Sequence, residues 1–239
     1  AMGEADPNGA QRLLFGARWD ADAVITTLQT VVMASFGDPT DGVLVIDETG
    51  FLKKGTHSVG VARQYSGTAG KVENCQIGVF LTYASAHGAT FLDRRLYLPE
   101  AWTQDRERCQ AAHVPATVSF QTKPQLARTM LADAFEHGVR AGWVTADSVY
   151  GSDRSLWVWL ARCRQPFVLG VRSSERVWLI APDGSRQQRT VAAAAAEVAA
   201  TAWERHSAGD GSKGPRWSDW AWLPVAGLLQ DDWGHWLLI

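Results

Sequence analysis

The feature that most constrains this chain is a pair of short apolar runs that each end in an aspartate. The first run is VLVI at residues 43–46, and Asp47 and Glu48 follow it. The second is WVTA at residues 143–146, and Asp147 follows it, one hundred positions after the first acid. Short apolar runs with β-branched residues predict strands that are buried on both faces. A carboxylate at the end of such a strand costs free energy unless it is paired.

Two strands that each end in an aspartate can bring both carboxylates to one edge of a sheet, where open α/β sheets bind their ligands. Mg²⁺ usually takes one or two protein carboxylates together with water and substrate phosphate. Asp47 and Asp147 therefore indicate a metal-dependent phosphoryl-transfer site with Mg²⁺ or Mn²⁺ as its cofactor. The alternative is a plain strand-to-turn junction in which the aspartate caps the turn. Residues 43–55 alone do not separate the two interpretations.

Longer blocks of sequence connect the two runs to a known family. The chain contains VIDETGFLKKG from Val45, a long block at residues 62–85, LYLPEAW from Leu96 and WVTADSVYG from Trp143. Together with QRLLFGARWDAD from Gln11, these blocks resemble a branch of the DDE transposases of bacterial insertion sequences. Their order and spacing match over nearly the whole chain. The block at residues 62–85 makes the resemblance specific, because aspartate motifs alone are weak evidence.

The resemblance implies an α/β fold, with a ribonuclease-H-like mixed sheet flanked by helices and a mostly β insertion after the second aspartate. It implies that Asp47 and Asp147 are the first two acids of a catalytic, metal-binding triad. The third acid of the family is a glutamate on a helix beyond the insertion, in a Tyr–Arg–Glu–Lys type signature. The late glutamates here, Glu175, Glu197 and Glu204, do not sit in such a signature. We therefore expect a truncated catalytic domain that is inactive by itself.

The chain divides into three expected segments. These are a helical segment at residues 1–40, an incomplete catalytic core at residues 41–171 and a β-rich insertion at residues 172–239. Apolar and polar residues predict strands at 58–65 and 75–84, and a further strand at 89–98. The resemblance implies that the strands at 43–46, 58–65 and 75–84 are antiparallel neighbours. Helical periodicity indicates helices at 100–112 and 122–138. The Gly- and Ser-rich run at residues 207–215 predicts a mobile segment.

Basic residues near the first acid are candidates for contacts with DNA: Lys53, Lys54, Arg63 and Lys71. A lysine pair beside a metal site suits a phosphate backbone, and a solvated turn is the alternative. The net charge of −2 gives no bulk electrostatic signature of nucleic-acid binding. The resemblance implies that DNA at the transposon ends is the partner of the full-length protein. It also implies a cytoplasmic, nucleoid-associated location, with a homodimer as the candidate assembly.

Other classes of site find no support in the sequence. The chain has no apolar run long enough to predict a membrane span. Cys75, Cys109 and Cys163 are odd in number and widely spaced, which fits neither a disulfide framework nor a zinc site. Glycine-rich nucleotide motifs are absent. Two other functions remain: a non-catalytic DNA-binding or interaction protein derived from a transposase, and a metal-dependent nuclease of the same fold that does not transfer strands.

Overall fold

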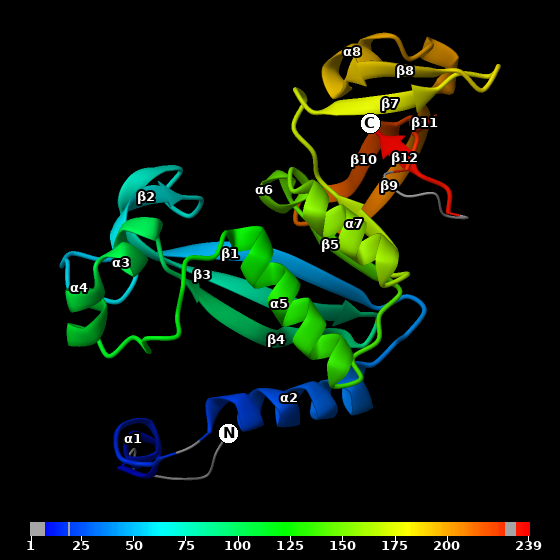
Figure 1. The fold of residues 1–239 in the computed structure, drawn as a ribbon. Helices are drawn as coiled ribbons and strands as arrows, with labels where there is room; N and C mark the ends of the chain where they lie inside the picture. Colours follow the sequence, from blue (N-terminus) through cyan, green and yellow to red (C-terminus); the bar gives the residue numbers. More distant parts are fainter. Residues whose placement is uncertain (1–7, 19, 228–232) are drawn as a thin grey trace.

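The computed structural model describes residues 8–18, 20–227 and 233–239. Its centre is a six-stranded sheet with the order β2-β3-β1-β5-β6, and β4 also pairs with β3 (Figure 1). The strands are β1 (Val43–Leu52), β2 (Ala62–Ser66), β3 (Lys71–Ser85), β4 (Gly88–Tyr97), β5 (Trp143–Ala146) and β6 (Phe167–Leu169). The long strand β3 therefore carries two partners on one side, β2 near its start and β4 along the rest.

The sheet is mixed. Strand β3 is antiparallel to β1, β2 and β4, whereas β5 is parallel to both β1 and β6. Three antiparallel strands followed by two parallel ones, with helices alongside, confirm the expected ribonuclease-H-like mixed α/β class. One detail of the expectation was wrong. Strand β2 does not lie beside β1, because β3 separates them, and the antiparallel trio is β1, β3 and β4.

Several of the helices begin after residues whose side chains cap them. They are α1 (Asn8–Phe15), α2 (Ala21–Phe36), α3 (Glu100–Gln104), α4 (Arg106–Ala111), α5 (Lys123–Glu136), α6 (Ser148–Gly151) and α7 (Arg154–Arg162). Asp20 caps α2 and Asp153 caps α7, and Thr122 forms a capping box with Gln125 at the start of α5. Helix α5 crosses one face of the sheet, and α2 packs against β4 and β3 (Figure 1).

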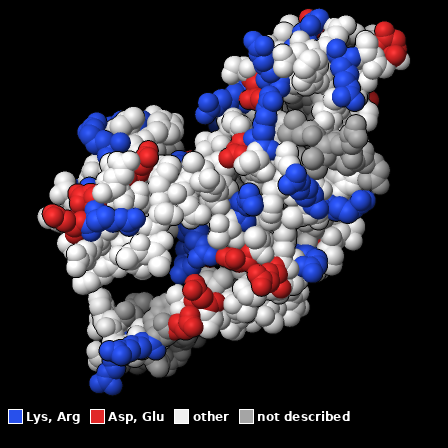
Figure 2. Space-filling view, in the orientation of Figure 1, with Lys and Arg blue, Asp and Glu red and all other residues white. Residues whose placement is uncertain are grey.

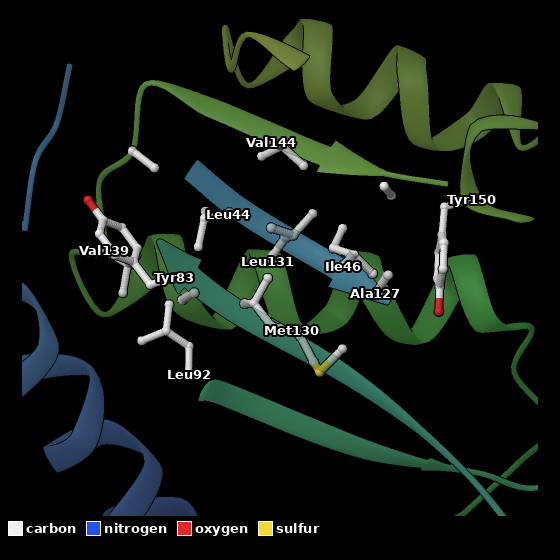
Figure 3. Packing of buried hydrophobic residues seen from close by; sticks show 14 of the residues in the cluster. Leu44, Ile46, Tyr83, Leu92, Ala127, Met130, Leu131, Val139, Val144 and Tyr150 are labelled. Atoms are coloured by element: carbon white, nitrogen blue, oxygen red, sulfur yellow. The ribbon is translucent and has the colours of Figure 1, made fainter. Parts of the chain in front are cut away.

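The main core lies between the sheet and α5. Figure 3 shows Leu44 and Ile46 of β1 beside Leu131 and Ala127 of α5, with Tyr83 near one end of the cluster and Tyr150 at the other. Because side chains alternate along a strand, the even-numbered residues of β1 point toward α5. The odd-numbered residues, Asp47 among them, point to the opposite face.

That opposite face of the sheet is open. Strand register places four large apolar side chains on it, and each is about half exposed: Phe51 (47%), Phe91 (61%), Trp143 (45%) and Val168 (51%). On the face toward α5, in contrast, Leu44 is fully buried and Ile46 is only 1% exposed. The sheet thus separates a packed side from an accessible side, and the two predicted acids belong to the accessible one.

Beyond β6 the chain forms smaller units. Strands β7 (Arg176–Ile180) and β8 (Arg186–Thr190) pair, as do β9 (Glu204–Gly211) with β10 (Gly214–Trp220) and β11 (Trp222–Pro224) with β12 (Trp236–Leu238). Helix α8 (Val191–Ala196) and the 3₁₀ turn η1 (Ala200–Ala202) lie between β8 and β9. A small cluster of Val177, Ala194 and Leu237 holds this region together. None of the described helices is long and apolar enough to cross a membrane.

Two sequence expectations were wrong in detail. Strand β1 does not end at Asp47 but continues to Leu52, because residues 47–52 pair with β3. The helix expected at 100–112 is two helices, since Asp105 ends α3 and its carboxylate caps α4 through the Arg108 amide. The run at 207–215, whose predicted mobility stays a prediction, contains parts of β9 and β10, which pair with each other, and Gly214 adopts a φ of 103° that favours glycine.

The packed face of the sheet predicts the effect of a core truncation. Leu131 of α5 is fully buried, so Leu131→Ala should lower the free energy of unfolding by about 2–5 kcal/mol through lost contacts and a residual cavity. Leu52→Ala is the matched control, because the same atoms are removed from a side chain that is 58% exposed. Urea unfolding of both variants measures the difference. Equal losses would contradict the burial of Leu131 in the core.

Candidate metal centre

Strand register brings the two predicted acids to neighbouring positions. Strands β1 and β5 pair in parallel from Val43 opposite Trp143 to Ile46 opposite Ala146. Asp47 and Asp147 are each the next residue, and adjacent strands lie about 4.8 Å apart. Both side chains are exposed, and side-chain alternation directs both to the open face. The two carboxylates therefore share one corner of the molecule, at the carboxyl end of the parallel strand pair.

Each carboxylate is fixed through one oxygen. Oδ1 of Asp47 accepts a hydrogen bond from the Glu48 amide at 2.8 Å, and Oδ1 of Asp147 accepts one from the Val149 amide at 2.9 Å. Asp147 is the N-cap of α6. The alternative considered from the sequence, an aspartate that caps a turn, is therefore correct for Oδ1 of Asp147. Oδ2 of either acid accepts no hydrogen bond from any described residue. Each aspartate is thus oriented by the backbone and keeps one oxygen available on the open face.

Electrostatics at this corner favour the arrival of a cation. Partial burial raises the pKa of the Asp47 carboxyl group, and the negative charges of Glu48 and Asp147 raise it further, although the Glu48 amide and Lys123 oppose the shift. Ionised Asp47 is therefore in a less favourable environment than it would be in water. Carboxylate oxygens are the ligands that Mg²⁺ and Mn²⁺ prefer. The donor set at Asp47 and Asp147 fits such an ion.

A third ligand does not accompany them within the described residues, where no group of three or more His, Cys, Asp or Glu side chains is placed to hold a metal ion. Glu48 is next to Asp47 in sequence, but alternation turns its side chain toward α5. The described part of the site therefore offers two carboxylates. Its remaining coordination positions are open to water, to substrate oxygens or to a further protein group.

Sequence reasoning missed the partners of Glu48. Its Oε1 accepts a hydrogen bond from Lys123 Nζ at 2.6 Å, and its Oε2 accepts one from the Tyr150 hydroxyl at 2.7 Å. Burial and the adjacent Glu48 carboxylate hold the pKa of Tyr150 far above its ordinary value, so its hydroxyl remains a donor. The available signal was alternation, because Glu48 continues the inward series of Leu44 and Ile46. A glutamate in that series needs partners.

The four basic candidates do not lie beside the acids. Lys53 comes six residues after Asp47, directly beyond β1, which corresponds to about 20 Å along an extended strand. Arg63 on β2 pairs in register with Asn74, and the Lys53 amide bonds to the carbonyl of that same Asn74. Lys54 is exposed, and Lys71 forms an ion pair with Glu73 at 2.8 Å. Figure 2 shows basic side chains over β2 and a second group over β7, β8 and α7.

Comparisons with known proteins agree with this geometry. Residues 2–222 match a family model described as DDE superfamily endonuclease. The probable transposase for insertion sequence element IS701 from Microchaete diplosiphon is 30% identical over 182 residues, which is 75% of this chain and 44% of that protein. The chain therefore spans less than half the length of this relative. Because the family match includes both aspartates and extends over most of the sequence, this chain belongs to the DDE superfamily of endonucleases.

Proposed function

We propose that this chain belongs to the catalytic domain of a DNA transposase from a bacterial insertion sequence, with Asp47 and Asp147 as catalytic, metal-binding acids. The observation that carries the proposal is the register of β1 with β5, which places two carboxylates side by side with one oxygen of each available. Family membership and the similarity to a probable transposase support this chemistry. The homodimer and the nucleoid-associated location expected from the resemblance stay predictions.

The two aspartates would act as ligands and not as covalent nucleophiles. When bound, Mg²⁺ or Mn²⁺ would supply Lewis-acid chemistry for an in-line displacement at a DNA phosphate, activating a water or a 3′-hydroxyl and stabilising the leaving oxygen. The chain itself orients the acids. The Val149 amide holds Oδ1 of Asp147, and the Glu48 amide holds Oδ1 of Asp47, so each Oδ2 is directed away from the backbone. The open face leaves room for DNA.

Contacts with the DNA backbone would come from residues distant from the acids. Lys53, Lys54, Arg63 and Lys71 lie around the β2–β3 hairpin. Strand register places Lys53 and Arg63 about 20 Å from Asp47 and Lys71 about 30 Å from it. One strand of DNA carries a phosphate about every 3.4 Å. We therefore propose that these residues bind phosphates roughly six to nine nucleotides from the reacting one, in the DNA of the transposon ends. Of the four, Lys71 should contribute least, since Glu73 already neutralises its charge.

The paired caps of α6 and α7 allow a direct test of metal binding. Asp147 and Asp153 are both N-caps with amide partners, and asparagine caps a helix about as well as aspartate. Asp47→Asn and Asp147→Asn should each weaken Mn²⁺ binding at least about tenfold, whereas Asp153→Asn should leave it unchanged. Isothermal titration with Mn²⁺ measures the affinities. If Asp147→Asn behaves like Asp153→Asn, Asp147 is a cap and not a ligand.

The raised pKa of Asp47 predicts that its removal stabilises the metal-free fold. Because the folded-state pKa lies above that of the unfolded chain, ionised Asp47 opposes folding. Asp47→Asn should therefore raise the free energy of unfolding at pH 7.5, by less than about 1 kcal/mol since the group is partly exposed and screened. The gain should shrink as the pH falls and vanish below the ordinary carboxyl pKa. Urea unfolding in EDTA across pH 3–8 measures it, and a destabilised Asp47→Asn at pH 7.5 would contradict the prediction.

We also expect this chain by itself to leave DNA uncut, because two carboxylates are a small ligand set for a two-metal reaction. The assay incubates the chain with Mn²⁺ and a supercoiled plasmid that carries the terminal repeats of the element. Nicked circles should not exceed those produced with Asp47→Asn. Nicking that the wild-type chain shows and Asp47→Asn lacks would overturn the expected inactivity while supporting the assignment of the acid.

A further inference from the structure

A partly buried polar cluster lies directly behind the two acids. Glu48 follows Asp47 on β1 but faces the opposite side of the strand, where its side chain is 19% exposed. Both of its oxygens are used: Lys123 Nζ lies 2.6 Å from Oε1, and the Tyr150 hydroxyl lies 2.7 Å from Oε2. Lys123 is itself 20% exposed and lies over the ring of Tyr97 at 5.9 Å. The cluster is therefore well enclosed and both oxygens of its acid are partnered.

The partners of Glu48 come from the elements that surround the acids. Lys123 is the first residue of α5, and Tyr150 belongs to α6. The Tyr150 ring is fully buried at one end of the main core cluster (Figure 3). Residues of β1, α5 and α6 are thus joined through one carboxylate, at the level of the sheet where both acids stand.

The Tyr150 bond also reaches the second acid. The carbonyl oxygen of Asp147 accepts hydrogen bonds from the amides of Tyr150 and Gly151, so Asp147 and Tyr150 belong to one tight turn. Gly151 closes that turn against β6, since a Cβ there would stand 1.8 Å from the Gly170 carbonyl oxygen. The hydroxyl bond to Glu48 consequently links the turn that carries Asp147 to the strand residue that follows Asp47.

Stability alone is a weak reason for such a cluster. Removing two charges from water is costly, and a buried ion pair is often no more stabilising than well-packed apolar residues. Charged hydrogen bonds do fix the relative positions of the groups that they join, because their lengths and angles are narrowly defined. Here those bonds hold the backbone at two positions next to proposed metal ligands. Groups that orient metal ligands from behind commonly affect metal affinity strongly.

We propose that Glu48, together with Tyr150 and Lys123, is a positioning residue that sets the separation and direction of the Asp47 and Asp147 carboxylates and so determines affinity for a divalent cation. The inference rests on the proposed function, in which those two acids bind the metal. In this proposal the open face of β1 presents a metal ligand, Asp47, and the packed face carries the residue that positions it, Glu48.

Two buried tyrosines provide a matched test. Tyr150→Phe removes one hydroxyl from the cluster, and Tyr83→Phe removes one from a fully buried tyrosine at the other end of the same core, where it bonds to the backbone of Asp38 and Arg140. Tyr150→Phe should weaken Mn²⁺ binding about 10–100-fold and change the electron paramagnetic resonance spectrum of bound Mn²⁺. Tyr83→Phe should alter neither, although both variants should lower the unfolding midpoint. Glu48→Gln, which keeps an acceptor for Tyr150 but loses the charge, should also weaken binding.

The outcomes separate this inference from the function on which it rests. If Asp47→Asn abolishes Mn²⁺ binding while Tyr150→Phe and Glu48→Gln bind as the wild type does, the positioning role is overturned and the proposed function stands. If Tyr83→Phe weakens binding as much as Tyr150→Phe, the effect is general loss of stability and the positioning role is again overturned. If Asp47→Asn binds Mn²⁺ as well as the wild type, the proposed function itself fails.

Discussion

The structure depends on the parallel pairing of β1 with β5. Four residue pairs, from Val43 with Trp143 to Ile46 with Ala146, define the register. A shift of one residue would turn one acid toward α5, because neighbouring side chains on a strand face opposite sides. The buried residues Leu44, Ile46 and Val144 prevent such a shift, since it would expose them. Apolar packing against α5 therefore fixes where the two carboxylates stand.

Two ionised carboxylates side by side repel each other and so lower the stability of the metal-free fold. The Glu48 charge next to Asp47 adds to this repulsion, yet Lys123 and Tyr150 satisfy Glu48 on the packed face. On the open face Asp47 and Asp147 receive only one backbone hydrogen bond each. Unfavourable ionisation of this kind concentrates at functional sites, where a ligand supplies the missing interaction.

Local sequence was sufficient for the elements whose signals are local. Residues 143–146 form a strand with the predicted bounds, and Asp20 and Asp153 cap the helices that follow them directly, α2 and α7. It was insufficient where a distant partner decides. Residues 47–52 contain Asp, Glu and Gly, which are poor strand formers, and they continue β1 only because β3 pairs with them. The Gly- and Ser-rich run at 207–215 similarly becomes a hairpin by pairing with itself. Lys123 could not be foreseen as a partner of Glu48, since 75 positions separate them.

The unequal treatment of the two faces of β1 argues for a functional interpretation of the acids. If Asp147 served only as the cap of α6, then a serine, threonine or asparagine would serve as well, and no second acid would need to stand beside it. If Asp47 were only a surface residue of an extended strand, nothing would require the next residue to be tied to both α5 and α6. Among the described residues, Lys123 and Tyr150 supply a cation and a hydroxyl to the acid on the packed side, whereas the pair on the open side accepts hydrogen bonds from backbone amides. This difference supports the proposal that the open-face carboxylates bind a divalent cation, because carboxylate oxygens are ligands that such ions prefer.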